Sequence, residues 1–212
     1  NLKKSLPSSN VWTFTEDSSG NYLFVGTDLG MSRLNRKTGL FTHFNRRNQN
    51  TESATKEAKF NVMSSYSIDS NTVLVGFEDG LFKLEIKEDQ TFGYTRLNYV
   101  NPIILSKYNR LYGIESLDAD NYLLATKDAV FLYNIITGVS KRFEHNINRP
   151  EESLSPGTCR VIYKDRKSRI WFATSSGGIN ILVKNDQGNY TIQPHPINDN
   201  IRKVTKDYAT AL

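Results

Sequence analysis

The sequence predicts an all-β protein, a β-propeller of four-stranded antiparallel blades, and three observations lead to that prediction. Small residues recur at intervals of 50, 49 and 48 positions: Gly26, Gly76, Ala125 and Ala173. A second column keeps almost the same period: Gly30, Gly80, Ala129 and Gly178. Aromatic residues, which favour strands, are numerous, with 11 Tyr and 11 Phe among 212 residues. A repeat of about 50 residues that cannot bury both of its faces alone is typical of blades stacked around an axis.

The first repeat shows the four strands most clearly. Residues 11–16 alternate between larger apolar and polar side chains, as a strand does. Asp17-Ser18-Ser19-Gly20 then forms a turn, because Asp bonds the backbone ahead of it and Gly accepts positive φ. The remaining predicted strands are 23–27, 31–35 and 40–44.

The repeat of about 50 residues continues along the chain and predicts one propeller fragment over residues 1–212. The expected blades are approximately 10–45, 60–98, 110–144 and 159–193. Residues 201–207 repeat the pattern of residues 160–165, so the first strand of a fifth blade is expected at 200–212. The chain would therefore be a partial ring that stops inside a blade, and its exposed blade faces should make the isolated piece associate.

Most of the repeated residues are expected to have structural roles. The aspartates of the first-to-second-strand turns are Asp17, Asp69, Asp118, Asp165 and Asp207. The Gly and Ala columns should mark places where neighbouring blades approach closely. In the turns where Gly20 is replaced, Asn71 and Asn121 are expected to adopt positive φ, and Ser168 less comfortably. Trp12 and Trp171 should pack between blades.

Composition and charge exclude several classes of function. The net charge of the chain is only +5, and its Lys and Arg residues are scattered along the sequence. No nucleic-acid partner is therefore expected. The single cysteine, Cys159, can form no intrachain disulfide or Cys-based metal site and should be buried filler. No apolar run approaches the roughly 20 residues of a membrane span, and no signal peptide opens the sequence. This segment is thus expected to make no membrane contact.

Two segments carry a family resemblance. Residues 11–31 contain Val-Trp, then Glu-Asp-Ser-Ser-Gly, then Gly-Thr-Asp-Leu-Gly-Met, and residues 153–179 contain a related series. Both resemble the two-component regulator propeller repeat, roughly V-x-x-I-x-E-D-x-x-G-x-L-W-I-G-T-x-x-G-L. The second and third repeats depart from it, since Phe77 replaces Thr and Leu74 and Leu123 stand near the Trp position.

The resemblance implies an extracytoplasmic sensor. Such repeats form seven-bladed propellers in the periplasmic half of hybrid two-component systems, followed by an immunoglobulin-like domain, a membrane span and a histidine kinase. Many of these receptors respond to oligosaccharides. The implied partners are therefore an oligosaccharide or other small ligand, the remaining blades and domains of the same protein, and a second copy in a homodimer.

The residues themselves give little sign of catalysis. His43, His145 and His195 lie in different predicted blades and show no metal-ligand spacing. His43 is expected on the exposed face of an outer strand. A glycosidase needs two carboxylates about 5–9 Å apart, but the repeated aspartates belong to turns opposite the usual site. We expect no metal, no cofactor and no enzyme activity in this segment.

The loops that connect one blade to the next are the expected ligand site. They share a face with the second-to-third-strand turns and vary in length, as functional loops do. Aromatic faces and planar Arg donors are suited to a sugar, especially an acidic one. The candidate ligand-binding residues are Arg46, Arg47, Tyr99, Tyr108, His145 and Arg149.

Two other functions stay open at this point. Propellers commonly serve as protein–protein interaction scaffolds, which would require a protein partner and no response to a small ligand. A polysaccharide-cleaving enzyme is the other alternative, and it would require release of reducing ends from a glycan.

Overall fold

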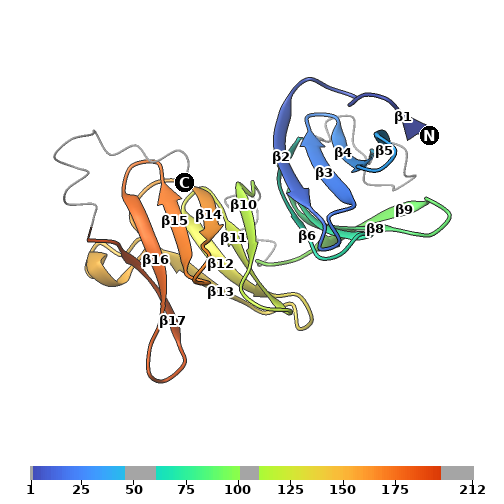
Figure 1. The fold of residues 1–212 in the computed structure, drawn as a ribbon. Coiled ribbons are helices and arrows are strands. Elements are labelled where there is room, and N and C mark those ends of the chain that lie inside the picture. The colour runs from blue at the N-terminus through green and yellow to red at the C-terminus, as the bar shows by residue number, and fades with distance from the viewer. Residues whose placement is uncertain (1, 46–60, 101–109, 197–212) are drawn as a thin grey trace. The chain divides into compact units, whose positions relative to one another are not determined.

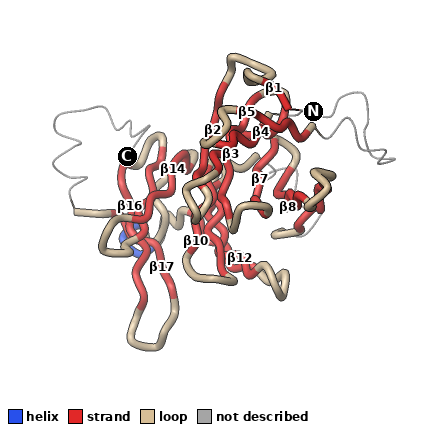
Figure 2. Tube along the Cα trace, turned by 45° about the vertical axis from the view of Figure 1, so that its right-hand side comes forward, coloured by secondary structure: helices blue, strands red, loops and turns tan. Residues whose placement is uncertain are grey.

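The computed structural model describes residues 2–45, 61–100 and 110–196. Strands and turns make up almost all of this part of the chain, and its only helical element is the short 3-10 helix η2 (Pro150–Glu152) (Figures 1 and 2). The strands form four antiparallel sheets, which confirms the prediction of an all-β fold with four four-stranded blades.

The chain divides into two compact units, and the first contains two sheets. Blade 1 has the strand order β1-β5-β4-β3-β2, and blade 2 has the order β6-β7-β8-β9. The strands of blade 1 are β1 (Leu2–Lys3), β2 (Val11–Glu16), β3 (Tyr22–Thr27), β4 (Gly30–Asn35) and β5 (Leu40–Phe44). Those of blade 2 are β6 (Val62–Ser67), β7 (Thr72–Phe77), β8 (Gly80–Ile86) and β9 (Phe92–Leu97).

The second unit contains blades 3 and 4, whose strands follow one another in simple sequence order. Blade 3 consists of β10 (Gly113–Ser116), β11 (Asn121–Ala125), β12 (Ala129–Asn134) and β13 (Ser140–Glu144). Blade 4 consists of β14 (Cys159–Lys164), β15 (Ile170–Thr174), β16 (Gly178–Lys184) and β17 (Tyr190–Pro194).

The predicted strands of blade 1 match the observed ones to within one residue. The predicted column of third-strand residues opens β4, β8, β12 and β16 in turn. One strand was not predicted: β1, which pairs with β5 through Lys3 and Phe41. A strand of two residues is too short to show any periodicity. The predicted fifth-blade strand, with Asp207, lies outside the described residues.

A threonine at the end of the second strand explains part of the repeat. The Oγ1 atoms of Thr27, Thr126 and Thr174 donate hydrogen bonds across the following turn, to the carbonyl oxygens of Gly30, Ala129 and Gly178. All three threonines are fully buried. The side chain thus satisfies a buried carbonyl at the start of the third strand, so the column is structural.

The first-to-second-strand turns confirm one expectation and correct another. Gly20 and Ser168 both have positive φ, at 70° and 59°. Asn71 and Asn121 were expected to do the same, but neither does. Their backbone N–H groups instead donate to Asp69 Oδ1 and Asp118 Oδ1.

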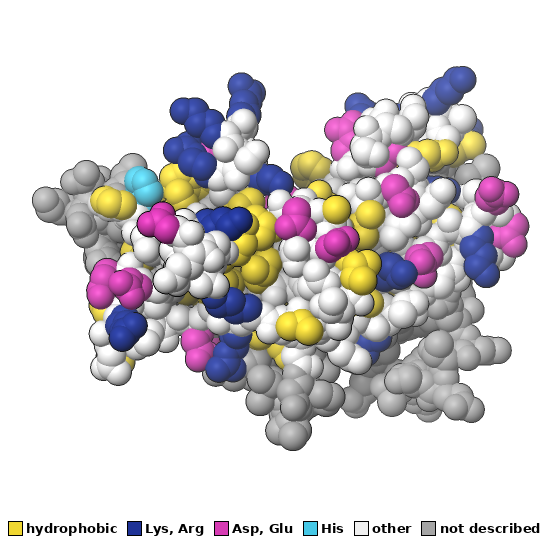
Figure 3. All heavy atoms as spheres, turned by 90° about the horizontal axis from the view of Figure 1, so that it is seen from below, with side chains coloured by type: hydrophobic (Ala, Val, Ile, Leu, Met, Phe, Trp, Pro, Cys, Tyr) yellow, Lys and Arg dark blue, Asp and Glu magenta, His cyan; other side chains and the backbone are white. Residues whose placement is uncertain are grey.

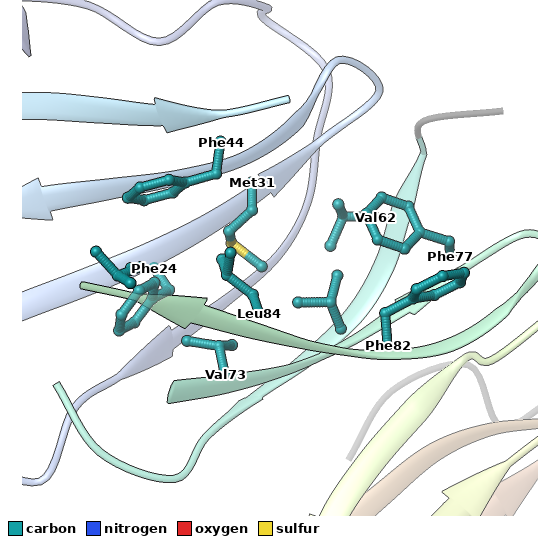
Figure 4. Close-up of a cluster of buried hydrophobic side chains, with 10 residues drawn as sticks. Phe24, Met31, Phe44, Val62, Val73, Phe77, Phe82 and Leu84 are labelled. Carbon is teal, nitrogen blue, oxygen red and sulfur yellow. The ribbon is translucent and has the colours of Figure 1, made fainter. Parts of the chain in front are cut away.

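Blades 1 and 2 pack through the predicted small-residue column. A Cβ atom added at Gly26 would lie 2.5 Å from Cγ1 of Val62, which opens blade 2. The apolar core of unit 1 continues this contact: side chains of blade 1, such as Phe24, Met31 and Phe44, point toward Val73 and Leu84 of blade 2 (Figure 4). Gly26 is therefore required by close approach, as expected.

A buried arginine crosses the same interface. Arg33 is 5% exposed, and its guanidinium donates to the Ser70 carbonyl oxygen (3.0 Å), Asn71 Oδ1 (3.0 Å) and Gln90 Oε1 (2.8 Å) of blade 2. Its Cζ atom also lies 4.6 Å from the ring centre of Tyr22. Burial lowers the pKa of Arg33, an effect that the nearby Tyr22 and Asp17 oppose.

Blades 3 and 4 pack in the same way with other side chains. Cys159 opens blade 4, is fully buried and shares a core with Ala125 of blade 3. Further along the strand, Ile162 lies against Gly113, where an added Cβ would be 3.4 Å from Ile162 Cγ1. Burial raises the pKa of the Cys159 thiol to about 12. The prediction that Cys159 is buried filler is confirmed.

Three side chains differ from expectation. Trp12, expected to pack between blades, is 53% exposed in this chain, where blade 1 is the first blade of the sequence. Trp171 is half-buried by residues of its own blade: its indole N–H donates to Asp165 Oδ2, and its ring lies beside His195. His43 was expected to be exposed on β5, but it is half-buried and hydrogen-bonds Ser32 Oγ through Nδ1 at 2.8 Å. The sequence shows the alternation of a strand but not which of its faces another element covers.

Candidate functional site

Four of the six predicted ligand-binding residues fall in the first two connections. Arg46, Arg47 and Tyr108 lie outside the described residues. Tyr99 is 1% exposed, and its ring centre lies 5.4 Å from that of Phe131 in an edge-to-face arrangement. Its carbonyl oxygen accepts a hydrogen bond from Ser140 Oγ at 2.5 Å. The structure therefore gives Tyr99 a packing position in unit 2, with its ring facing away from solvent.

The other two, His145 and Arg149, lie on the described connection between blades 3 and 4. His145 is exposed, and its Nδ1 lies 3.0 Å from the Leu154 carbonyl oxygen. Arg149 is exposed and lies 4.0 Å from Glu152 within the same connection. The connection thus brings His145 near Leu154 and leaves Arg149 at its surface.

Buried residues anchor the end of this connection. Ser153, Leu154 and Ser155 are all buried, and Leu154 belongs to the apolar core of unit 2. The backbone N–H of Ser155 donates to Asn180 Oδ1, itself fully buried, at 2.9 Å. Because its far end is fixed in the core, the connection presents His145 from a defined position.

In unit 2 the connection between blades and the second-to-third-strand turn share one face, as expected. The second-to-third-strand turn of blade 4 packs against the connection: Thr158 N–H donates to Ser175 Oγ, and Ser176 Oγ donates to the Pro156 carbonyl oxygen. At Gly177, an added Cβ would lie 2.9 Å from Pro156. Turn and connection therefore lie on one face of blade 4, as predicted.

A hollow of about 500 Å³ lies beside His145. Its walls are the outer strand of blade 3, the connection and the outer strand of blade 4. The residues that line it are Lys141, Arg142, Phe143, Glu144, His145, Asn146, Ile147, Glu152, Ser153, Leu154, Tyr190, Thr191 and Ile192. This groove is the candidate functional site.

The groove combines polar groups with aromatic surface. Lys141 Nζ donates to the Tyr190 carbonyl oxygen at 2.8 Å and so joins the two outer strands. Arg142 pairs with Glu144 at 3.1 Å on an exposed surface. Tyr190 is half-buried, and Phe143 forms part of the floor. Hydrogen-bonding groups of both kinds around an aromatic ring can hold a hydroxyl-rich ligand.

Most residues of the groove were not predicted from the sequence, because only the connections between blades were considered as ligand sites. Lys141 and Tyr190 come from β13 and β17, which are adjacent only after the blades pack. One signal was available: Lys141 and Tyr190 occur 49 positions apart, one repeat, in equivalent outer strands. A search for polar and aromatic pairs at the repeat spacing would have selected them.

The aspartates of the first-to-second-strand turns serve structure, as predicted. Asp17 is 3% exposed and accepts from the Tyr22 N–H (2.8 Å), Ser70 Oγ (2.5 Å) and Ser19 Oγ. Burial alone would raise the pKa of Asp17, but these hydrogen bonds hold it at about 2. The Trp171 N–H, followed by Arg169, holds the pKa of Asp165 well below its ordinary value. Asp69 and Asp118 each accept turn N–H groups.

Within residues 2–45, 61–100 and 110–196, no group of three or more His, Cys, Asp or Glu residues is placed to hold a metal ion. No helix in the same part of the chain is long and apolar enough to cross a membrane. On the face drawn in Figure 3, basic, acidic and hydrophobic side chains are interspersed in small groups.

Four-stranded antiparallel sheets, packed through a repeated small residue, are the blades of a β-propeller. No protein-family model and no curated protein matches this chain. Solved structures do. The extracellular domain of BT3049 from B. thetaiotaomicron, described as a hybrid two component system, matches with a TM-score of 0.65 and 21% identity, over 98% of this chain and 24% of that one.

Two further matches widen the comparison. The extracellular domain of BT4673 from B. thetaiotaomicron, described as a one component system, has a TM-score of 0.63 and 15% identity over 91% of this chain and 22% of that one. Virginiamycin B lyase from Staphylococcus aureus has a TM-score of 0.56 and 15% identity over 90% and 58% of the two chains. The chain spans about a quarter of the two extracellular domains. At these identities the likeness establishes the propeller fold, which the two extracellular domains and the lyase share.

Proposed function

We propose that this chain is part of the ligand-sensing extracytoplasmic propeller of a hybrid two-component sensor histidine kinase, and that its ligand is an oligosaccharide. The observation that carries the proposal is the match of 98% of the chain to the extracellular domain of BT3049. The repeat residues around Trp12 and Trp171 resemble the propeller repeat of such regulators. In this role the protein lies in the periplasm and the segment itself is not an enzyme.

The groove beside His145 supports a sugar ligand. Tyr190 supplies an aromatic ring, while Lys141, Glu144 and His145 supply hydrogen-bonding groups around it. A hollow of about 500 Å³ lies within the usual range for small-molecule sites. Arg149, on the same connection, and Arg46, Arg47 and Tyr108 stay proposed contributors from the connecting loops. Tyr99, packed in the interior, would support the ligand site indirectly.

Signalling would follow from differential binding. A ligand held by β13, β17 and the connection would contact two blades at once, so it would favour the arrangement of blades that fits it best. In the complete receptor, with its remaining blades and a second copy as a homodimer, that preference would reach the membrane-spanning part. A ligand that bound both arrangements equally would shift nothing.

Binding to a panel of defined oligosaccharides, neutral and acidic, tests the proposal. We expect saturable binding of one sugar class by calorimetry, weakened roughly 5- to 50-fold by Tyr190→Ala, Lys141→Ala or His145→Ala. Arg166→Ala is the matched control, because Arg166 is exposed in the first-to-second-strand turn of blade 4 and does not line the groove. Saturable binding of no sugar, or equal affinity in groove and control variants, contradicts the proposed ligand.

Catalysis on a polysaccharide is the second candidate, and one observation favours it: lyase propellers share the fold. Incubation with a glycan panel, followed by detection of new reducing or unsaturated ends, decides between the two. Products that vanish with Glu144→Gln and His145→Ala would replace the sensor proposal with an enzyme. Unchanged glycans favour binding alone.

A further inference from the structure

The charged side chains of the groove beside β13 and β17 balance one another. Two of the residues that line it are basic, Lys141 and Arg142, and two are acidic, Glu144 and Glu152. The ring of His145 adds no charge when it is neutral. The lining as a whole therefore carries no net charge, so it offers no excess of positive charge to an anionic ligand.

The arginines at the groove are each paired with a glutamate. Arg142 Nη2 lies 3.1 Å from Glu144 Oε1, and Arg149 Nη1 lies 4.0 Å from Glu152 Oε2. From the sequence, Arg149 was a candidate donor to an acidic sugar. In the structure, an incoming carboxylate would have to compete with the glutamate that each arginine already contacts. It would also lie close to that like charge, which disfavours it.

The lysine of the groove is also engaged by neighbouring groups. Lys141 Nζ donates to the Tyr190 carbonyl oxygen at 2.8 Å and lies 5.1 Å from the ring centre of Phe143. The ammonium group therefore already has an acceptor and an aromatic face. Its other donors can serve a hydroxyl oxygen as well as a carboxylate. Lys141 thus joins the two outer strands and does not by itself select an anion.

His145 contributes an acceptor when its ring is neutral. Its Nδ1 lies 3.0 Å from the Leu154 carbonyl oxygen. Because a carbonyl oxygen can only accept, the proton of the neutral ring is on Nδ1, and Nε2 has a lone pair for a hydrogen-bond donor. A sugar hydroxyl can donate to Nε2, whereas an ionised carboxylate has no proton to give.

The floor of the groove is apolar. Phe143, Leu154 and Ile192 are buried, and Ile147, which is 81% exposed, lines the groove from the connection. A carboxylate placed against such a surface would lose hydration without a full replacement. The C–H face of a sugar ring would instead gain apolar contact, with the ring of Tyr190 also in the lining.

We propose that this groove selects neutral oligosaccharides and discriminates against acidic ones. The inference rests on the proposed function, because it names the class of sugar bound at the site proposed there. A hydroxyl group both donates and accepts, so it can meet the acceptors Glu152 Oε and His145 Nε2 as well as the donor Lys141 Nζ. Arg149 contributes indirectly, by balancing the charge of Glu152.

Matched pairs of ligands give the first test. Each neutral hexose oligosaccharide is compared, by calorimetry at about pH 8 where imidazole is neutral, with the uronic-acid oligosaccharide of the same linkage and length. We expect the neutral member to bind about 10-fold tighter or more. Equal or tighter binding of the acidic member overturns the inference and leaves the oligosaccharide ligand standing. Saturable binding of neither member overturns the proposed ligand and the inference with it.

Removing one carboxylate from the lining gives the second test. Glu152→Gln takes away the carboxylate beside Arg149 and gives the lining a net positive charge. The ratio of acidic to neutral affinity should therefore rise about 5-fold or more.

Glu151→Gln is the matched control for this variant. Glu151 is exposed on the same connection and carries the same charge, but it does not line the groove. The ratio should change less than about 2-fold, because solvent and salt screen an exposed charge outside the groove. Both glutamates are exposed, and circular dichroism should show that both variants fold. An unchanged ratio in Glu152→Gln, or an equal change in the two variants, overturns the inference.

Discussion

In each unit two neighbouring blades pack against each other, but the side chains at the contact differ between the units. In unit 1 a valine fills the space above a glycine, and a buried arginine donates three hydrogen bonds to the neighbouring blade. In unit 2 a cysteine shares a core with an alanine. There the cation is Lys164, whose Nζ donates to the Ser116 and Leu117 carbonyl oxygens of blade 3.

This comparison shows which features of the blade-to-blade contact are common to both units and which vary. In both units a buried side chain opens a first strand and lies in a core shared with the preceding blade, over Gly26 in unit 1 and together with Ala125 in unit 2. The cation that crosses the interface changes in identity, in strand and in burial, so it is not part of the repeat. Apolar fit above a small residue should therefore carry most of the blade-to-blade stability, and the polar contacts should add to it locally.

Adding a methyl group at Gly26 should have the largest effect. Gly26→Ala places a methyl group 2.5 Å from Val62 Cγ1, so we expect a loss of about 3 kcal/mol in unfolding free energy. Gly93→Ala is the matched control, because no atom lies within 4 Å of a Cβ added there. Urea unfolding measures both. A control as damaging as Gly26→Ala would mean that strand glycines matter for reasons other than blade contact.

Removing the crossing cation should come next. Arg33→Met leaves the Ser70 carbonyl and two side-chain oxygens without their donor inside the interface, for an expected loss of about 2 kcal/mol. Lys164→Met removes a half-buried donor from two carbonyls and should cost about 1 kcal/mol or less. The same denaturant titration compares them. Equal losses would show that burial does not distinguish the two cations.

How much of this fold could be predicted depends on whether the signal is local. Column residues such as Gly30 and Gly80 marked the starts of third strands, because turn chemistry and alternation act within a few residues. The exposure of Trp12 could not be predicted, because alternation shows that a strand has two faces and does not show which of them another element covers. Asn71 was misassigned: its N–H donates to Asp69 Oδ1 and its φ is not positive, which the residue type alone does not show.

Only part of the candidate site could be predicted from the sequence. His145 was selected because it lies in a variable connection, and the structure places it in the lining of the groove. Lys141 and Tyr190 were not selected, because they become neighbours only when two outer strands pack side by side. Tyr99 was chosen by residue type, although its ring is buried against Phe131. Residue chemistry alone does not report which way a side chain faces.

A smaller effect is expected from acid. Because the pKa of Asp17 lies at about 2, below its ordinary 3.8, the unfolded chain binds more protons than the folded chain between these values. The stability that Asp17 provides is present above about pH 4 and is lost as the pH falls toward 2. After screening by solvent it should amount to about 1 kcal/mol. Asp17→Asn should flatten this part of the stability–pH curve. An unchanged slope would contradict the assignment.

The smallest effect should come from exchanging Cys159, which opens blade 4, for the valine that opens blade 2. Cys159→Val places in unit 2 the side chain that unit 1 uses at Val62, so we expect a change within about 1 kcal/mol. Thermal unfolding followed by circular dichroism measures it. A loss of about 3 kcal/mol or more would mean that each interface is specific to its own side chain and that the positions of Val62 and Cys159 are not equivalent.

The most direct test of the central claim is a double-mutant cycle between Gly26 and Val62. Gly26→Ala and Val62→Ala should each destabilise the chain, the first by crowding and the second by leaving a cavity. Combined, the new methyl group occupies space that the valine vacates, and its contact with Thr13 Cγ2 of the same blade, at 2.6 Å, remains. The account predicts that the double variant loses about 2 kcal/mol less than the sum of the two single losses. Losses that add to within about 0.3 kcal/mol would show that the two residues do not form one contact between blades.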